Sequence, residues 1–160
     1  MKKIIILILA LSFLISVNGY ALKNPLLDMR SRFFQESNSI KLLLKNSRDV
    51  ILLSTLWDSC FITMTQLDAY FSMVGIFESL RKGNLTDVAI NYLLSWLDEI
   101  KKTSATNINS LNSAAAGIDP QTKIIVERMK INFSDLNKLV GGEINTLLKL
   151  REGLKTKKAR

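Results

Sequence analysis

The chain of 160 residues contains no histidine and only one cysteine, Cys60. Without histidine it lacks the commonest general base, the usual haem ligand and the commonest zinc ligand. A single cysteine excludes CxxC redox motifs and haem-attachment motifs. The sequence also has no glycine-rich phosphate loop, no dinucleotide-binding fingerprint and no GxSxG elbow. These absences predict a protein that is not an enzyme and that holds no metal and no cofactor.

The aspartates are the remaining candidates for acid–base chemistry. Asp58 and Asp68 lie on one side of a predicted helix, but ten residues separate them, which is about 15 Å along the axis. Catalytic carboxylate pairs lie about 5 to 9.5 Å apart, so these two residues do not form one. A carboxylate from another helix stays open as a partner. We expect instead that both aspartates meet Lys or Arg from the first or fourth helix, or face solvent.

The lone cysteine indicates that the fold depends on an apolar core rather than on disulfides. Cys60 lies close in sequence to Leu56, Phe61 and Met64, which favours a buried thiol. The alternative is a disulfide between two chains.

The first residues have the pattern of a secretory signal peptide. A basic start (MKK) precedes an apolar run over residues 4–17, and small residues follow at a cleavage site after Gly19 or, alternatively, Ala21. The apolar run is about 14 residues, shorter than the roughly 20 that a spanning helix needs. We therefore predict a signal peptide over residues 1–19 and an exported protein, periplasmic or extracellular. The pattern leaves a bacterial and a eukaryotic source open.

The rest of the chain is predicted to be helical, because proline and glycine are sparse and fall near expected helix ends. Asn24-Pro25 and Asp119-Pro120 each pair an N-cap residue with proline at the first helical position. Gly83 and Gly117 are typical stops. The expected helices cover residues 25–45, 48–82, a third segment that follows a capping box at 84–87 and ends near 116, and a fourth segment from 120. Residues 103–113 have the composition of a loop, but the apolar phase continues through them.

Two of these helices carry heptad seams. The seam residues of the third are Leu93, Leu97, Ile100, Ser104, Asn107, Leu111, Ala114 and Ile118; those of the fourth are Thr122, Val126, Met129, Phe133, Leu136, Val140, Glu143, Leu147, Leu150 and Leu154. Gly141 and Gly142 lie within the second seam, either where a neighbour packs closely or at a kink. The predicted fold class is all-α: an elongated antiparallel helical bundle of three long helices plus a shorter N-terminal helix, after a cleaved signal peptide. The bundle domain spans residues 20–148.

The helix over residues 48–82 is apolar around most of its circumference. Its polar residues Ser54, Asp58, Thr65, Asp68, Ser72 and Ser79 fall within about 40° of one line, which we name the polar stripe. So apolar a helix should be covered on most sides, as the central helix of the bundle or by another chain. Asp58, Asp68 and Ser72 are the candidate partner contacts. The two aspartates argue against a transmembrane helix.

The C-terminal residues 149–160 form a predicted basic tail. Its bases oppose only Glu152 and give a net charge of +5, out of +8 for the whole chain; they are Lys149, Arg151, Lys155, Lys157, Lys158 and Arg160. Such a tail is a candidate contact for an anionic lipid or envelope polymer. The alternative is a solvated helix end whose cations suit the helix dipole.

These features favour a protein partner or self-association: a secreted or periplasmic, non-enzymatic interaction or assembly module. The alternative is peripheral binding to lipid or to an anionic envelope surface. Trp57 and Trp96 are expected in the core and do not interleave with bases, which argues against nucleic acid as a partner. Glycosylation sequons at Asn84 and Asn132 matter only in a eukaryotic source.

Overall fold

The computed structural model describes residues 24–81, 86–114 and 117–158. These residues form four α-helices and no strand: α2 (Pro25–Leu43), α3 (Val50–Arg81), α4 (Asp87–Ser113) and α5 (Pro120–Lys158). The prediction of an all-α protein is therefore confirmed. The predicted signal peptide, Gly83, Asn84 and Arg160 lie outside the described residues.

The predicted capping residues account for the starts of α2 and α5. The Asn24 side chain accepts a hydrogen bond from the Leu26 N–H at 2.9 Å, and Asp119 Oδ1 accepts one from the Gln121 N–H at 2.9 Å. Each cap satisfies a backbone donor that has no partner inside the helix. Proline follows at the first helical position, where its missing N–H costs nothing.

The predicted capping box at residues 84–87 is wrong in register. The N-cap of α4 is Thr86, whose hydroxyl accepts a hydrogen bond from the Ala89 N–H at 3.3 Å. Threonine is itself a preferred N-cap residue. In this register Asp87 occupies the first turn, where its negative charge suits the helix dipole.

Close packing of a neighbour was one of the two explanations expected for Gly141 and Gly142 of α5. Gly141 and Gly142 lie inside the helix, as predicted, but an added Cβ at either position would have nothing within 4 Å. Close approach of a neighbour therefore does not explain them. Gly117, in contrast, has a φ of 80° between α4 and α5, a conformation that glycine adopts without strain.

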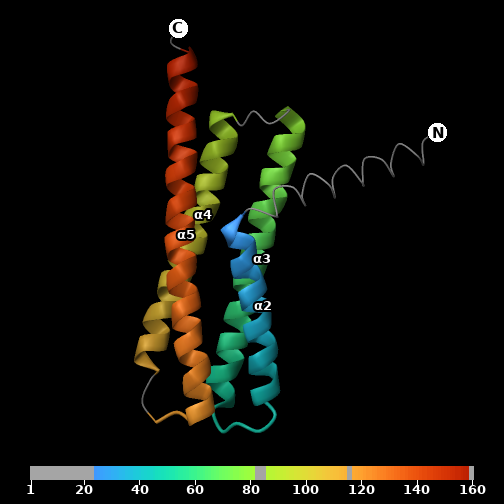
Figure 1. Ribbon diagram of the computed structural model, residues 1–160, viewed down its shortest axis with the longest axis vertical. Coiled ribbons are helices and arrows are strands. Elements are labelled where there is room, and N and C mark those ends of the chain that lie inside the picture. Colours follow the sequence, from blue (N-terminus) through green and yellow to red (C-terminus); the bar gives the residue numbers. More distant parts are fainter. Residues whose placement is uncertain (1–23, 82–85, 115–116, 159–160) are drawn as a thin grey trace, which may run out of the picture.

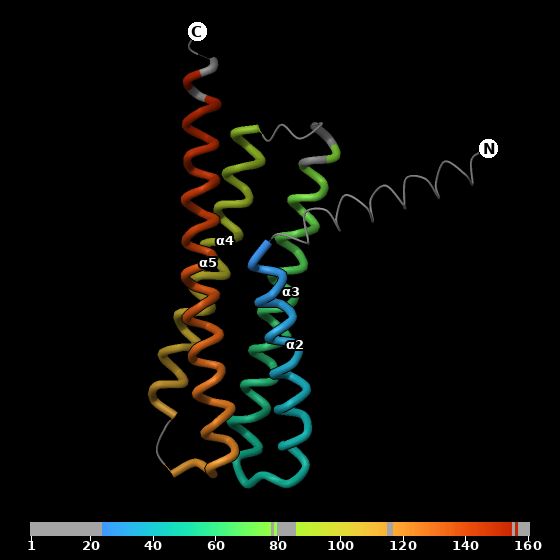
Figure 2. Tube along the Cα trace, viewed as in Figure 1, coloured from blue at the N-terminus to red at the C-terminus, as the bar shows by residue number. Residues whose placement is uncertain are grey.

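Each helix packs mainly against two others. α2 contacts α3 and α5, and α4 contacts the same two helices; the α4–α5 contact is the most extensive of the four and the α3–α4 contact the least. The helices lie side by side along the long axis (Figure 1). The end of α5 continues past the ends of α3 and α4 (Figure 2).

A continuous apolar core fills the space between the helices. The α2 residues predicted to share one face are buried, and the Phe33 ring lies 5.0 Å from that of Phe133 in α5. Both heptad seams also point inward, since all their apolar residues from Leu93 to Leu111 and from Val126 to Leu147 are buried. Leu150, near the projecting end of α5, is 45% exposed. Asn132 is also buried, so its sequon is not accessible in the folded chain.

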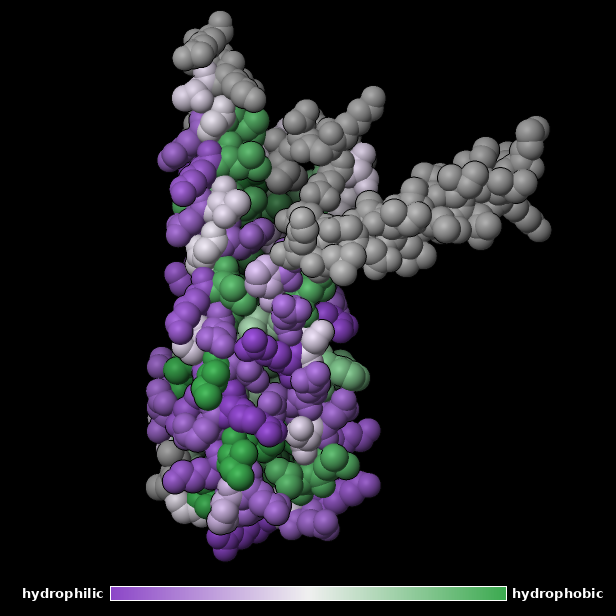
Figure 3. Space-filling view, in the orientation of Figure 1, coloured by the Kyte–Doolittle hydropathy of each residue, from purple (hydrophilic) through white to green (hydrophobic). Residues whose placement is uncertain are grey.

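Two ion pairs join α2 to α5 at the surface. Arg32 pairs with Asp135 of α5 at 3.3 Å, and Arg128 pairs with Glu36 at 2.8 Å. The face formed by α2 and α5 is largely hydrophilic, and its hydrophobic residues appear as separate patches (Figure 3). That face therefore offers no continuous apolar surface.

Candidate functional site

The outer side of α3 carries an apolar groove. Its lining comes from α3 except for one tryptophan of α4; the residues are Trp57, Asp58, Phe61, Ile62, Thr65, Gln66, Ala69 and Trp96. We call this surface the α3–α4 groove. Its volume of about 640 Å³ lies in the range of small-molecule pockets. However, Phe61 and Ile62 are 55% and 52% exposed, so the groove does not enclose a ligand and is better suited to an extended partner.

The groove exists because α3 is more apolar than its two neighbours require. Its inner residues, including Leu53, Cys60 and Leu67, are fully buried. Since α3 packs mainly against α2 and α4, its outer side is uncovered, and Ile51 there is 86% exposed. The prediction that α3 is the central helix of the bundle is therefore wrong. The alternative, coverage by another chain, stays open.

Three hydrogen bonds hold α4 against α3 at the groove. The indole N–H of Trp96 donates to the backbone oxygen of Gln66 at 2.9 Å. Gln66 Nε2 donates to Thr103 Oγ1 at 3.2 Å, and Ser59 Oγ donates to Asn107 Oδ1 at 3.3 Å. On α3 itself, the ring centroids of Trp57 and Phe61 lie 5.3 Å apart. These contacts hold Trp96 against α3 and place Trp57 beside Phe61.

The floor also contains a polar atom without a partner. Gln66 Oε1 is buried and accepts no hydrogen bond from any described residue. An unsatisfied buried acceptor costs about 1–3 kcal/mol.

The structure separates the three candidate residues of the polar stripe. Asp68 accepts two hydrogen bonds from the Arg30 guanidinium of α2, at 2.5 and 2.9 Å, which confirms the expected pairing with a base of the first helix. Ser72 Oγ donates to the backbone oxygen of Asp68 at 2.8 Å. Asp58 is exposed at the groove and has no ion pair or hydrogen bond to any described residue. Of the three, only Asp58 lines the groove.

The predicted basic tail is part of α5, because the helix continues without a break to Lys158. Lys149 is exposed. Arg151 donates from Nη1 to Asn91 Oδ1 of α4 at 2.9 Å, while its Nε is buried without a partner among the described residues. For Lys155, Lys157 and Lys158 the structure describes the helical backbone only. The basic residues and the α3–α4 groove are thus separate surfaces.

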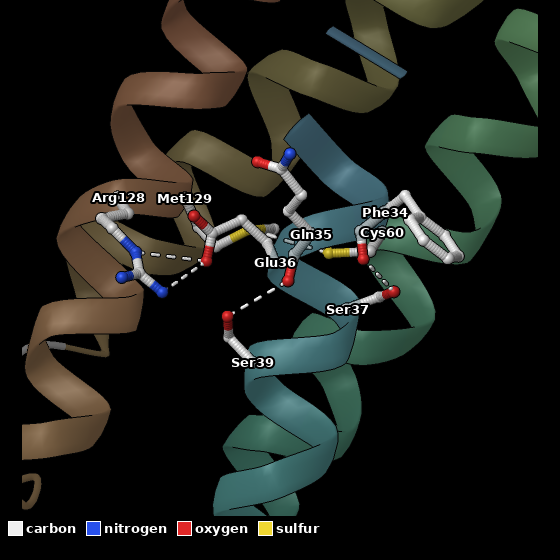
Figure 4. Close-up of polar contacts among 8 residues, drawn as sticks. All are labelled: Phe34, Gln35, Glu36, Ser37, Ser39, Cys60, Arg128 and Met129. Atoms are coloured by element: carbon white, nitrogen blue, oxygen red, sulfur yellow. Dashed lines mark hydrogen bonds and ion pairs between the residues drawn. The ribbon is translucent and has the colours of Figure 1, made fainter. Parts of the chain in front are cut away.

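Cys60 is a buried thiol, as the sequence favoured. Its Sγ lies 3.7 Å from Met129 Sδ in α5 (Figure 4), and the residue is 0% exposed. Burial, together with the negative charge of Glu36, raises the pKa of Cys60 to about 12. A disulfide between two chains requires an accessible sulfur, so the folded chain does not offer Cys60 for it.

Metal-binding clusters and the two aspartates were compared with the sequence predictions. Searching the described residues for three or more clustered His, Cys, Asp or Glu side chains finds no group that could hold a metal ion. Asp68 is committed to Arg30 and is unsuited to act as a second catalytic carboxylate. By length and composition, the segment Val50–Phe77 of α3 is the one described segment that could cross a membrane; core helices of soluble proteins also meet this criterion.

Sequence reasoning missed the two tryptophans as site residues. Trp57 and Trp96 were expected in the core, but both are only partly buried and line the groove. One signal was available: Ile51, Ile62 and Ile76 lie along one edge of the polar stripe of α3, and isoleucines beside polar positions indicate an exposed apolar surface.

The chain matches no protein-family model, no curated protein and no solved structure.

Proposed function

We propose that the protein is exported, loses residues 1–19, and acts as a non-enzymatic interaction module in the periplasm or outside the cell. In this proposal its helices form an elongated antiparallel bundle. The single observation that supports an interaction function is the α3–α4 groove, an apolar surface with aromatic walls. Contiguous exposed apolar surface is typical of protein interaction sites, and aromatic residues such as Trp57, Phe61 and Trp96 are typical of the residues that contribute most to binding.

A comparison of two isoleucine variants tests this proposal. Ile62 in the groove is 52% exposed and Ile131 on α5 is 60% exposed, so aspartate at either position should be tolerated by the fold. We expect Ile62→Asp to abolish the crosslinking of partner proteins in the envelope fraction. If the partner is a second copy of the chain, the same substitution should abolish the dimer that light scattering detects. Ile131→Asp should leave both unchanged. The proposal is contradicted if the protein is a monomer and both variants crosslink to the same proteins.

The second candidate function is binding to an anionic lipid or envelope surface. The observation that favours it is the basic end of α5, which continues past the other helices (Figure 2). Basic residues near a surface attract anionic headgroups by about 1 kcal/mol each. Co-sedimentation with anionic vesicles tests it, comparing the protein with a variant in which the four lysines of residues 149–158 are glutamine. The absence of pelleting in both rejects lipid binding.

A further inference from the structure

The outer surface of α3 carries negative charge without positive charge. From Val50 to Leu80 the helix contains acidic residues and no lysine or arginine. Asp68 is neutralised by Arg30. Asp58 has no such base among the described residues, and its side chain is exposed. The α3–α4 groove therefore combines an apolar wall with one uncompensated carboxylate.

The facing helix does not supply the missing cation. On α4, Asp98 pairs with Lys102 at 2.8 Å, and the neighbouring Glu99 and Lys101 are both exposed. These four side chains carry no net charge. The negative charge of Asp58 is therefore not offset by the part of α4 that lines the groove.

The basic end of α5 is also too distant to compensate Asp58. The connections before α3 and α5 meet, because the Asp119 N–H donates to Asp49 Oδ2 at 2.8 Å, so both helices start at one level. At 1.5 Å per residue, Asp58 lies about 12 Å from that end and Lys149 about 43 Å. The separation of about 30 Å is several times the Debye length of about 8 Å at physiological salt. The end of α5 therefore does not compensate the Asp58 carboxylate.

The groove has the dimensions of a helix-binding surface. Its α3 residues run from Trp57 to Ala69, which corresponds to about 18 Å along the axis. An amphipathic helix presents side chains at i, i+3, i+4 and i+7 over such a length. The half-exposed Phe61 and Ile62 are positioned to contact those side chains.

We propose that the α3–α4 groove binds an amphipathic helix of a partner protein that carries a lysine or arginine beside its apolar face, at the level of Asp58. This inference rests on the proposed function and adds the chemistry of the partner. Burial of apolar surface supplies most of the affinity. The ion pair with Asp58 selects cationic over anionic helices and sets the register, as charges at interfaces generally do.

Intrinsic tryptophan fluorescence can detect a ligand in the groove. The protein has two tryptophans, and both line the groove, so a ligand without tryptophan that enters it shifts the emission to shorter wavelength. The probes are two 18-residue amphipathic peptides of one apolar pattern, one of leucine and lysine, the other of leucine and glutamate. We expect the lysine peptide to bind about 1.4- to fivefold more tightly, the range of an exposed ion pair. Asp58→Asn should remove this preference and Asp58→Lys should reverse it.

The controls separate this inference from the proposed function. Ile62→Asn, which adds no charge beside Asp58, should weaken both peptides at least about tenfold, and Ile131→Asn should weaken neither. Circular dichroism and thermal melting confirm that each variant is folded. Equal affinities for both peptides that Asp58→Lys does not change overturn the cationic partner and leave the groove as a docking site. No emission shift with either peptide overturns both. A shift with anionic vesicles and with neither peptide assigns the groove to lipid and overturns the helix.

Discussion

On the inner face of α3, Cys60, Leu67 and Tyr70 are fully buried, whereas on the outer face Phe61 and Ile62 are more than half exposed. The two aspartates of α3 differ in a similar way. Asp68 is paired with Arg30 next to α2, and Asp58 lies unpaired beside the groove. Since both faces belong to one helix, composition alone does not explain the difference. The neighbouring helices determine which apolar residues of α3 are buried and which stay exposed.

The largest expected difference between the two faces is in stability. Leu67 is 0% exposed and Ile62 is 52% exposed. Leu67→Ala should lower the free energy of unfolding by about 2–5 kcal/mol because it leaves a cavity, whereas Ile62→Ala should change it by less than about 0.5 kcal/mol. Chemical denaturation of the two variants measures this. Equal losses would mean that the outer face of α3 is covered in solution.

A pH titration of stability probes the inner face next. The pKa of Cys60 is raised from 9.0 to about 12, so folding favours the neutral thiol. Its contribution is fully present below pH 9 and is lost as the pH rises toward 12, by about 1.4 kcal/mol per pH unit. Wild type should therefore lose more stability between pH 9 and 11 than Cys60→Ala does. Parallel pH profiles would indicate an accessible thiol.

The hydrogen bond at the floor of the groove gives a smaller effect. Trp96→Phe removes the donor to the Gln66 backbone oxygen and should cost about 1 kcal/mol of stability. Trp57→Phe is the matched control, because the Trp57 indole makes no hydrogen bond to a described residue. Thermal melting of the two variants measures the difference. A larger loss for Trp57→Phe would show that α4 is not held by this bond.

The two aspartates should show the smallest difference. Asp68→Asn weakens an exposed ion pair with Arg30 and should cost about 0.2–1 kcal/mol, less at high salt. Asp58→Asn should leave stability unchanged, since Asp58 has no partner among the described residues. Denaturation at low and high salt compares the two. A salt-dependent loss for Asp58→Asn would reveal a pairing base.

The sequence predicts the helices well because their limits depend on local chemistry. Asn24 and Asp119 are side chains that cap a helix on their own, and α2 and α5 begin where these residues predict. The predicted start of α4 was wrong because Asn84 and Thr86 are both suitable caps, and residue preference alone does not choose between them.

The groove was harder to predict because it depends on which side of α3 is left uncovered by α2 and α4. The nearly uniform apolarity of α3 indicates that it seeks cover, but it does not indicate which side α2 and α4 will occupy. Trp57 and Trp96 are of a residue type that is usually buried, yet they line the groove. Pairing of Asp68 with the first helix was expected; the unpaired state of Asp58 follows only from the positions of all neighbouring bases.

The connection between α2 and α3 is hydrogen-bonded to the connection between α4 and α5. Ser47 Oγ donates to Asp119 Oδ2 at 3.5 Å, and the Asp119 N–H donates to Asp49 Oδ2 at 2.8 Å. A chain divided between α3 and α4 would thus yield two helical hairpins that share this clasp and complementary apolar faces. The α2–α3 and α4–α5 hairpins are therefore suited to reassembly from separately expressed fragments.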